Sequence, residues 1–71
     1  MLVGLKQSKK AVEAGEVSLA YVANDADNEV VAPFLDLCRK NDVAVDRRYD
    51  MKELAKLCKV DVPTAVAVVL V

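Results

Sequence analysis

A short basic segment directly behind a glycine is the first feature of this chain that could do chemistry. Gly4 is followed by Lys6, Gln7 and Lys10, and at 100° per residue these three side chains fall within one quadrant of a helix. Lysine donates hydrogen bonds to phosphate or to the O6 and N7 atoms of guanine, and glutamine offers a donor and an acceptor to a base edge. Free N–H groups in the first turn of a helix also favour phosphate. The pattern indicates structured RNA with exposed purine edges, and a solvated helix face is the alternative interpretation.

Residues that commonly carry catalysis or bind metals are scarce. The 71-residue chain has no histidine, and Cys38 and Cys58 lie 20 positions apart with no C-x-x-C pattern. Zinc sites normally need four Cys or His ligands, so we expect no metal and no cofactor. Asp25 and Asp27 could be paired carboxylates, but in a turn-rich segment such residues more often cap helices and form turns. No nucleophile, phosphate-loop or dinucleotide motif occurs, so we expect that the protein is not an enzyme.

The sequence indicates neither secretion nor insertion into a membrane. Cys38 and Cys58 fall on apolar helix faces and no secretory signal precedes them, so we expect free thiols rather than a disulfide. The longest apolar run, residues 65–71, is far shorter than a membrane span. We therefore expect a cytoplasmic protein.

Composition is typical of one small folded domain over residues 1–71 with unevenly placed charge. Hydrophobic residues make up 55% of the chain, which is enough for a core. The net charge is −1, which argues against nonspecific binding of polyanions. Basic residues nevertheless outnumber acidic ones over residues 1–16 and 47–59, with an acidic stretch at 24–46 between these blocks. One phenylalanine and two tyrosines are too few for binding that depends mainly on base stacking.

Hydrophobic periodicity and turn residues predict three helices that alternate with three strands. The predicted helices, marked by apolar residues at helical spacing, are residues 6–14, about 30–40 and 51–58. The predicted strands, marked by short apolar runs, are residues 19–23, 43–48 and 65–71. Gly15 should end the first helix, and Asp50 and Glu53 should form a capping box for the third. This alternation predicts an α/β fold with the sheet between helix layers, a three-layer α/β/α sandwich.

Four segments in a fixed order carry a family resemblance that covers nearly the whole chain. They are VGLKQSKKAVEAG, YVANDADN, LDLCRKNDVAV and DMKELAKLCKVDVPTAVAVVLV. Together they resemble the ribosomal L7Ae/L30e family, in which a helix start of the form G-x-N-E-x-x-K is followed by A-x-D-A-D/E-P, L-x-x-L-C and a closing V/I-x-V-P segment. The first segment is closest to the bacterial form, in which Lys and Gln replace Asn and Glu. The resemblance implies an L30e-like α/β/α sandwich that binds kink-turn or kink-loop RNA.

The resemblance also implies which residues contact the RNA. The set is Gly4, Lys6, Gln7, Lys10, Asp27, Val31, Val60, Asp61, Val62 and Pro63. Gly4 would let the backbone approach the RNA, and the three polar residues after it would read tandem sheared G·A pairs. Asp27 and Val31 would lie near a flipped-out nucleotide. The loop of residues 60–63 would pack over that nucleotide. Lys59 departs from the family pattern, which has a small residue there; it would either add a phosphate contact or, with Leu57, change how the recognition loop sits.

Two departures from the family pattern support a second hypothesis. The family's L-G-x-A-x-G becomes LAKLCK at residues 54–59. Only residues 1–3 precede Gly4, where family members carry another helix and most of a strand, so we expect an N-terminally short fold without an outer helix and with an incomplete edge strand. Together with the net charge of −1, these departures favour a small protein-interaction or oligomerisation module that has lost RNA binding.

We prefer the first hypothesis, a noncatalytic L7Ae-like protein that recognises kink-turn RNA. Its expected partner is a structured RNA, with rRNA and the ribosome as candidates. We expect neither a membrane nor a small-molecule substrate as a partner.

Overall fold

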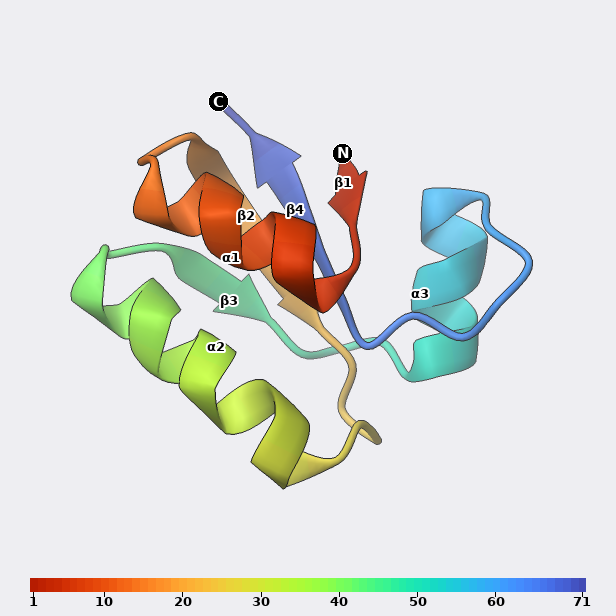
Figure 1. Ribbon diagram of the computed structural model, residues 1–71. Helices are drawn as coiled ribbons and strands as arrows, with labels where there is room; N and C mark the ends of the chain where they lie inside the picture. Colours follow the sequence, from red (N-terminus) through yellow and green to blue (C-terminus); the bar gives the residue numbers. More distant parts are fainter.

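The computed structural model describes residues 1–71 as three helices and a four-stranded sheet. In chain order the elements are β1 (Leu2–Val3), α1 (Leu5–Glu13), β2 (Val17–Val22), α2 (Asn28–Lys40), β3 (Ala44–Asp46), α3 (Met51–Cys58) and β4 (Val66–Leu70) (Figure 1). All six predicted elements are confirmed, each within two residues of its expected bounds. The strand that the sequence did not predict is β1, whose two residues are too few to show a period.

The order and direction of the strands bring the starts of the three helices together. The sheet order is β1-β4-β2-β3. Strand β4 runs antiparallel to β1 and β2, whereas β2 and β3 are parallel. Strands β1, β2 and β3 therefore point the same way, and each is followed by a helix (Figure 1). We call the end of the sheet where these helices begin the carboxyl edge; it comprises Gly4, residues 23–27, residues 47–50 and the segment 60–65 that leads into β4.

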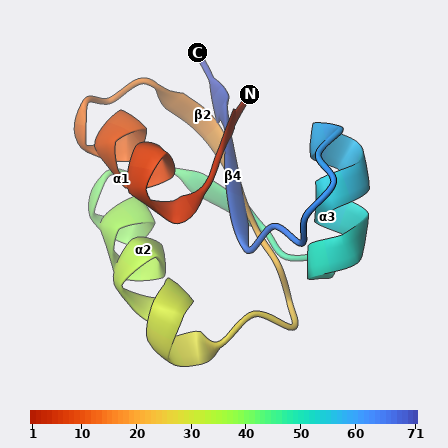
Figure 2. The same cartoon turned by 45° about the vertical axis from the view of Figure 1, so that its right-hand side comes forward.

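Helices cover both faces of the sheet, which confirms the predicted α/β/α sandwich. Helices α1 and α2 lie on one face and α3 lies on the other (Figure 2). Side chains alternate along β4, as a pleated strand requires. Val66 and Val68 join the larger core under α1 and α2, and Ala67 packs with Ala23 and Leu54 in the smaller core under α3.

Local signals explain where the helices begin and end. Asp50 accepts a hydrogen bond from the Glu53 N–H at 2.8 Å, and Glu53 accepts one from the Asp50 N–H at 3.2 Å, which confirms the capping box of α3. Gly15 follows α1 with φ of 71°, a left-handed conformation in which glycine has no steric penalty. Helix α2 begins two residues before its predicted start because Asp27 caps it.

Both chain termini lie at the end of the sheet opposite the carboxyl edge (Figures 1 and 2). The Val71 N–H donates a hydrogen bond to the Glu16 carbonyl at 2.9 Å, which holds the last residue beside the start of β2. Leu2 pairs with Val68 in the middle of β4. The chain thus enters and leaves the fold on the side away from the helix starts.

Candidate nucleic-acid interface

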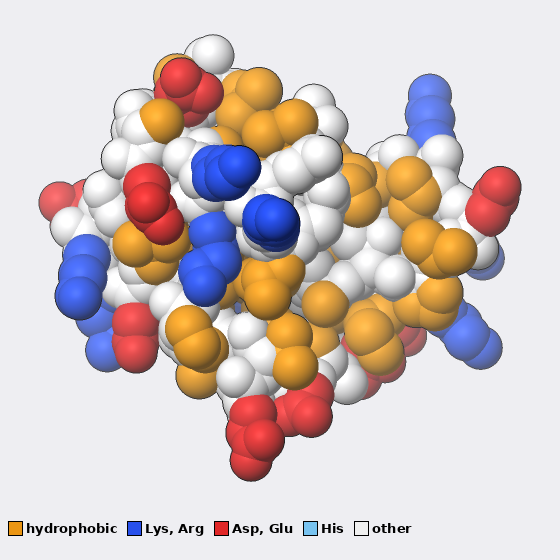
Figure 3. Space-filling model, viewed as in Figure 1, with side chains coloured by type: hydrophobic (Ala, Val, Ile, Leu, Met, Phe, Trp, Pro, Cys, Tyr) orange, Lys and Arg blue, Asp and Glu red, His pale blue; other side chains and the backbone are white.

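Helix α1 presents a basic face with no acidic partner. Lys6, Gln7 and Lys10 are exposed, whereas Ser8 and Val12 on the opposite side are buried. The structure has one ion pair, between Arg48 and Asp46, so the α1 lysines remain unpaired. Figure 3 shows Lys and Arg side chains gathered over α1. This arrangement matches the predicted basic quadrant.

The start of α1 is open to an anion. The helix has no side-chain cap and no acidic residue in its first turn, so its first N–H groups and its dipole are not offset by a carboxylate. The N-cap is Gly4, with φ of 108°, a conformation that side-chain-bearing residues rarely adopt. No atom lies within 4 Å of the position that a Cβ would occupy there. The glycine is therefore required by the backbone turn, and its surroundings are open.

Backbone hydrogen bonds join the predicted site segments at the carboxyl edge. The Gly4 N–H donates to the Val66 carbonyl at 3.0 Å, and the Ala23 N–H donates to the Ala65 carbonyl at 2.8 Å. The start of β4 therefore lies between the end of β1 and the end of β2. As a result, the start of α1, Asp27 and the loop before β4 belong to one edge of the molecule.

Asp25 and Asp27 accept backbone hydrogen bonds at the starts of two different helices, in agreement with the capping and turn interpretation. Asp27 accepts a hydrogen bond from the Glu29 N–H at 2.9 Å, at the start of α2. Asp25 accepts one from the Met51 N–H at 2.9 Å, at the start of α3. The loop after β2 is thus fixed to α3, and each carboxylate is engaged by a backbone donor.

The loop of residues 60–63 is anchored on α3 and exposes an apolar tip. The Val60 N–H donates to the Ala55 carbonyl at 3.0 Å, and the Thr64 N–H donates to the Met51 carbonyl at 3.2 Å. Between these anchors the side chain of Val62 is 66% exposed. Lys59, which ends α3, has φ of 59° and is exposed.

A groove lies between α3 and this loop. Its volume is about 420 Å³. The lining residues are Lys52, Ala55, Lys56, Val60, Asp61, Val62 and Pro63. The groove therefore combines an apolar wall with two lysines and one carboxylate. The sequence patterns predicted the loop residues but not Lys52 or Lys56, although their spacing of four residues on a predicted helix was a signal that could have found them.

Two neighbouring valines of α2 differ in exposure. Val31, a predicted site residue, has a fully buried side chain in the larger core. Val30 is 46% exposed and is the apolar side chain that α2 presents near Asp27. Helical periodicity places both residues on apolar stripes, so the pattern alone could not select Val30.

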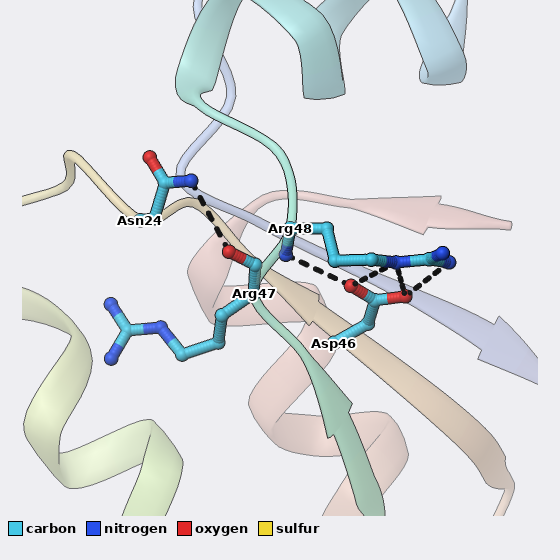
Figure 4. Close-up of polar contacts among 4 residues, drawn as sticks. All are labelled: Asn24, Asp46, Arg47 and Arg48. Atoms are coloured by element: carbon cyan, nitrogen blue, oxygen red, sulfur yellow. Dashed lines mark hydrogen bonds and ion pairs between the residues drawn. The ribbon is translucent and has the colours of Figure 1, made fainter.

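The residues after β3 form polar contacts within the molecule, and Figure 4 shows those between Arg48 and Asp46 and between Asn24 and the Arg47 carbonyl. Arg48 forms an ion pair with Asp46 at 2.9 Å, and its hydrogen bonds hold the pKa of the Asp46 carboxyl below its ordinary value. The Arg47 guanidinium donates to the Ala23 carbonyl at 3.2 Å, and Asn24 donates to the Arg47 carbonyl at 3.2 Å. Among the basic residues of the segment 47–59, the lysines of α3 are therefore the ones that have no carboxylate or carbonyl partner within the molecule.

The cysteines are free thiols. Cys38 is buried, Cys58 is half-buried, and burial raises the pKa of each thiol. No group of three or more His, Cys, Asp or Glu side chains is arranged to hold a metal ion. No helix has the length and apolar character needed to cross a bilayer.

Comparison with known proteins gives matches along the whole chain. The model of the ribosomal protein L7Ae/L30e/S12e/Gadd45 family matches residues 1–71. RNA-binding protein TTE2299 of Caldanaerobacter subterraneus is 36% identical over 66 residues, which are 93% of this chain and 80% of the relative. RNA-binding protein YbxF of Geobacillus stearothermophilus is 31% identical over 70 residues, which are 99% of this chain and 85% of the relative.

A solved structure matches the fold closely. The 15.5kD RNA binding protein of Giardia lamblia aligns with a TM-score of 0.89 at 30% identity over 97% of this chain. The aligned part is 58% of the Giardia chain, so this chain spans little more than half the length of that protein.

Proposed function

Because this chain belongs to the ribosomal protein L7Ae/L30e/S12e/Gadd45 family, we propose that it binds structured RNA at the carboxyl edge of its sheet. The observation that carries the proposal is the convergence of an uncapped, lysine-bearing helix start and an exposed apolar loop at one edge. Lysine and N–H donors suit phosphate, and glutamine suits a base edge. Relatives that are named RNA-binding proteins support the same ligand class.

The RNA that we propose is a kink-turn with tandem sheared G·A pairs. In this interpretation Lys6, Gln7 and Lys10 face the purine edges of those pairs, and residues 60–63 pack over the nucleotide that the kink turns outward. Phosphate contacts by the lysines supply affinity, and base-edge contacts supply specificity. Binding also shifts the RNA toward its bent conformation, because the protein contacts that conformation best.

Residues 1–71 act in this proposal as one RNA-binding domain without catalysis. An rRNA kink-turn would make the protein a cytoplasmic ribosome component. Co-sedimentation with ribosomal subunits tests this finer assignment, because a ribosome component remains with a subunit through a sucrose gradient and a protein that binds another RNA does not.

The decisive experiment is a binding titration with two RNAs at two salt concentrations. One RNA carries the tandem sheared G·A pairs, and in the other Watson–Crick pairs replace them. We expect tight binding to the first RNA, weak binding to the second, and an affinity that falls as salt rises, because phosphate contacts release counterions.

The other outcomes separate the alternatives. Equal, weak binding to both RNAs would leave only general electrostatic attraction. Absence of binding, together with salt-insensitive self-association, would support the protein-interaction module, since the sheet ends in two short free edge strands, β1 and β3.

A further inference from the structure

Strand β3 forms an edge of the sheet and is unpaired on its outer side. It bonds to β2 on one side, and no strand lies on the other. The outward N–H and C=O groups of an edge strand are donors and acceptors that an added strand can use. Ala44 and Val45 are both exposed, so this edge is open to solvent.

A groove lies between β3 and α2, which run beside each other (Figure 1). Its volume is about 400 Å³. Three apolar side chains and two arginines line it, namely Leu35, Val43, Val45, Arg39 and Arg47. Figure 4 shows the Arg47 side chain directed toward α2, away from the ion pair between Arg48 and Asp46. None of the lining residues belongs to the set that is proposed to contact RNA.

The two arginines of the groove can each bind an anion. The one ion pair of the structure is between Arg48 and Asp46, so neither Arg39 nor Arg47 has a carboxylate partner. Arg47 donates to the Ala23 carbonyl at 3.2 Å, which fixes its guanidinium and leaves other N–H groups of the five unused. No acidic residue lines the groove. A carboxylate is the side chain that a guanidinium binds with two parallel hydrogen bonds.

The period of a strand sets the order of these features along the groove. Val43, Val45 and Arg47 all line it, as alternate residues of a strand share one face. The Val43 N–H donates to the Cys38 carbonyl at 2.9 Å, which places the end of α2 that carries Arg39 beside Val43. The two arginines therefore lie toward opposite ends of the groove, and the apolar surface lies between them.

We propose that this groove and the outer edge of β3 bind an extended peptide segment of a partner protein. The segment adds a fifth strand beside β3. Its side chains on the α2 face are acidic, apolar and acidic at three alternate positions. The apolar side chain packs on Val45 and Leu35, and the two carboxylates meet Arg39 and Arg47. The inference goes beyond the proposed function and does not rest on RNA binding.

The charges around the groove favour a peptide over a nucleic-acid strand. Asp36 on α2 and Asp42 in the turn after it are exposed, and residues 24–46 hold six acidic residues against Arg39 and Lys40. A nucleic acid carries a charge at every phosphate, so this acidic stretch would repel it along its length. A peptide needs only two carboxylates at fixed positions, and its backbone supplies both the donors and the acceptors that an edge strand requires.

The first test uses a designed peptide as the probe. The peptide TETVTET, blocked at both ends, places Glu, Val and Glu at alternate positions, and TKTVTKT is its control. Backbone amide shifts of the isotope-labelled chain are followed by NMR up to millimolar peptide, because a contact this small binds weakly. We expect TETVTET to shift the amides of Ala44, Val45 and Asp46, and TKTVTKT to bind at least roughly tenfold more weakly.

A charge reversal tests the role of the arginines. Arg39→Glu reverses one cation of the groove and leaves the contact of Arg47 with Ala23 in place. Lys40→Glu is the matched control, because Lys40 is the next residue of α2, is exposed and does not line the groove. We expect Arg39→Glu to weaken binding of TETVTET by roughly tenfold and to strengthen binding of TKTVTKT. We expect Lys40→Glu to change either by about twofold or less.

Two N-methylated forms of TETVTET test the pairing of strands. In a strand that joins a sheet edge, the N–H groups of alternate residues point toward the sheet and the others point away. We expect methylation of one alternate set of amides to abolish binding and methylation of the other set to leave it nearly unchanged. Equal effects of the two methylated forms would contradict strand addition.

The remaining outcomes overturn the inference. The peptide proposal is wrong if TETVTET causes no shifts at β3, or if TKTVTKT binds as well as TETVTET does. It is also wrong if an oligo-uridine strand shifts the groove residues and TETVTET does not, or if sedimentation shows that a second copy of this chain occupies the β3 edge. None of these measurements uses kink-turn RNA, so failure of this inference leaves the proposed function untouched.

Discussion

Gln7 and Lys9 lie close together on α1 and differ in residue type and in exposure. Gln7 is exposed on the basic face, whereas Lys9 is half-buried and lies outside that face. The types and helical spacing of the exposed residues were enough to predict this face. The burial of Val31 could not be predicted in the same way, because periodicity does not show which of two adjacent apolar residues, Val30 or Val31, will be buried against the sheet.

We predict that Gln7→Ala reduces discrimination between the kink-turn and its Watson–Crick mutant more than Lys9→Ala does. A good base-edge contact contributes about 1–3 kcal/mol of discrimination, and a lysine that meets only phosphate contributes to both RNAs alike. Titration of each variant against both RNAs measures the ratio of dissociation constants. Equal losses on the two RNAs for Gln7→Ala would contradict the assignment of Gln7 as a base-reading residue.

Asp46 gives a prediction for the dependence of stability on pH. Hydrogen bonds from Arg48 lower the pKa of this carboxyl in the folded protein. Its stabilising contribution is therefore complete above the ordinary pKa of about 3.9 and is lost as pH falls through the lowered folded-state value. We expect Asp46→Asn to have a lower Tm than the unchanged chain at pH 7, by a small margin because the Arg48 side chain of the pair is 76% exposed.

The difference in Tm should shrink as the pH is lowered below about 4. Thermal melts of both proteins between pH 7 and pH 3 measure it. Asp36→Asn, which removes an exposed carboxylate from α2, is the control for the loss of one surface charge. A difference that stays constant over this range would show that the Asp46–Arg48 pair does not carry the effect.

At the scale of the elements, the predictable features are those with a local cause. The capping box of α3 and the glycine after α1 were both recognisable from residue type and position. The strand order was not, because periodicity shows which faces are buried and does not show which strands pair. The site segments lie together because of that strand order, so local patterns alone could not predict that Gly4 is next to the start of β4. Only the family resemblance implied that these segments form one surface.

The two glycines allow a matched test of the turn into α1. Gly4 and Gly15 both have positive φ, at 108° and 71°, and neither has an atom near a potential Cβ. Substitution of either by Ala should therefore destabilise the fold through backbone strain of about 1–3 kcal/mol. We expect only Gly4→Ala to weaken RNA binding as well, because Gly4 sets the position of the first turn of α1.

Urea denaturation of both glycine variants measures the loss of stability, and titration at a temperature where both are folded measures RNA binding. Comparable RNA affinity for the two variants would mean that the first turn of α1 can shift without consequence for the ligand.

At the scale of the whole molecule, the two faces of the sheet are covered unequally. The larger core lies under α1 and α2, whereas the smaller core consists of Ala23, Leu54 and Ala67. Leu54 is the one large fully buried side chain of the smaller core. Small domains have little stability to spare, so the attachment of α3 and of the loop that follows it depends strongly on this residue.

We therefore predict that Leu54→Ala lowers the free energy of unfolding by about 2–5 kcal/mol. Leu57→Ala is the matched control, since Leu57 lies on the same helix and is exposed. Urea denaturation followed by circular dichroism compares the two variants. A similar, small effect for both would indicate that α3 is not held by its buried leucine.

The position of the two chain ends has a practical consequence for assembly. Met1 and Val71 lie at the end of the sheet away from the helix starts (Figure 1). A tether, fluorophore or additional domain fused at Val71 would project away from the carboxyl edge, whereas the Met1 sulfur lies 3.3 Å from the Cys58 sulfur, next to Lys59 at the end of α3. The protein can therefore be fixed to a surface or built into a larger particle through its C-terminal end, with its proposed RNA-facing side directed outward.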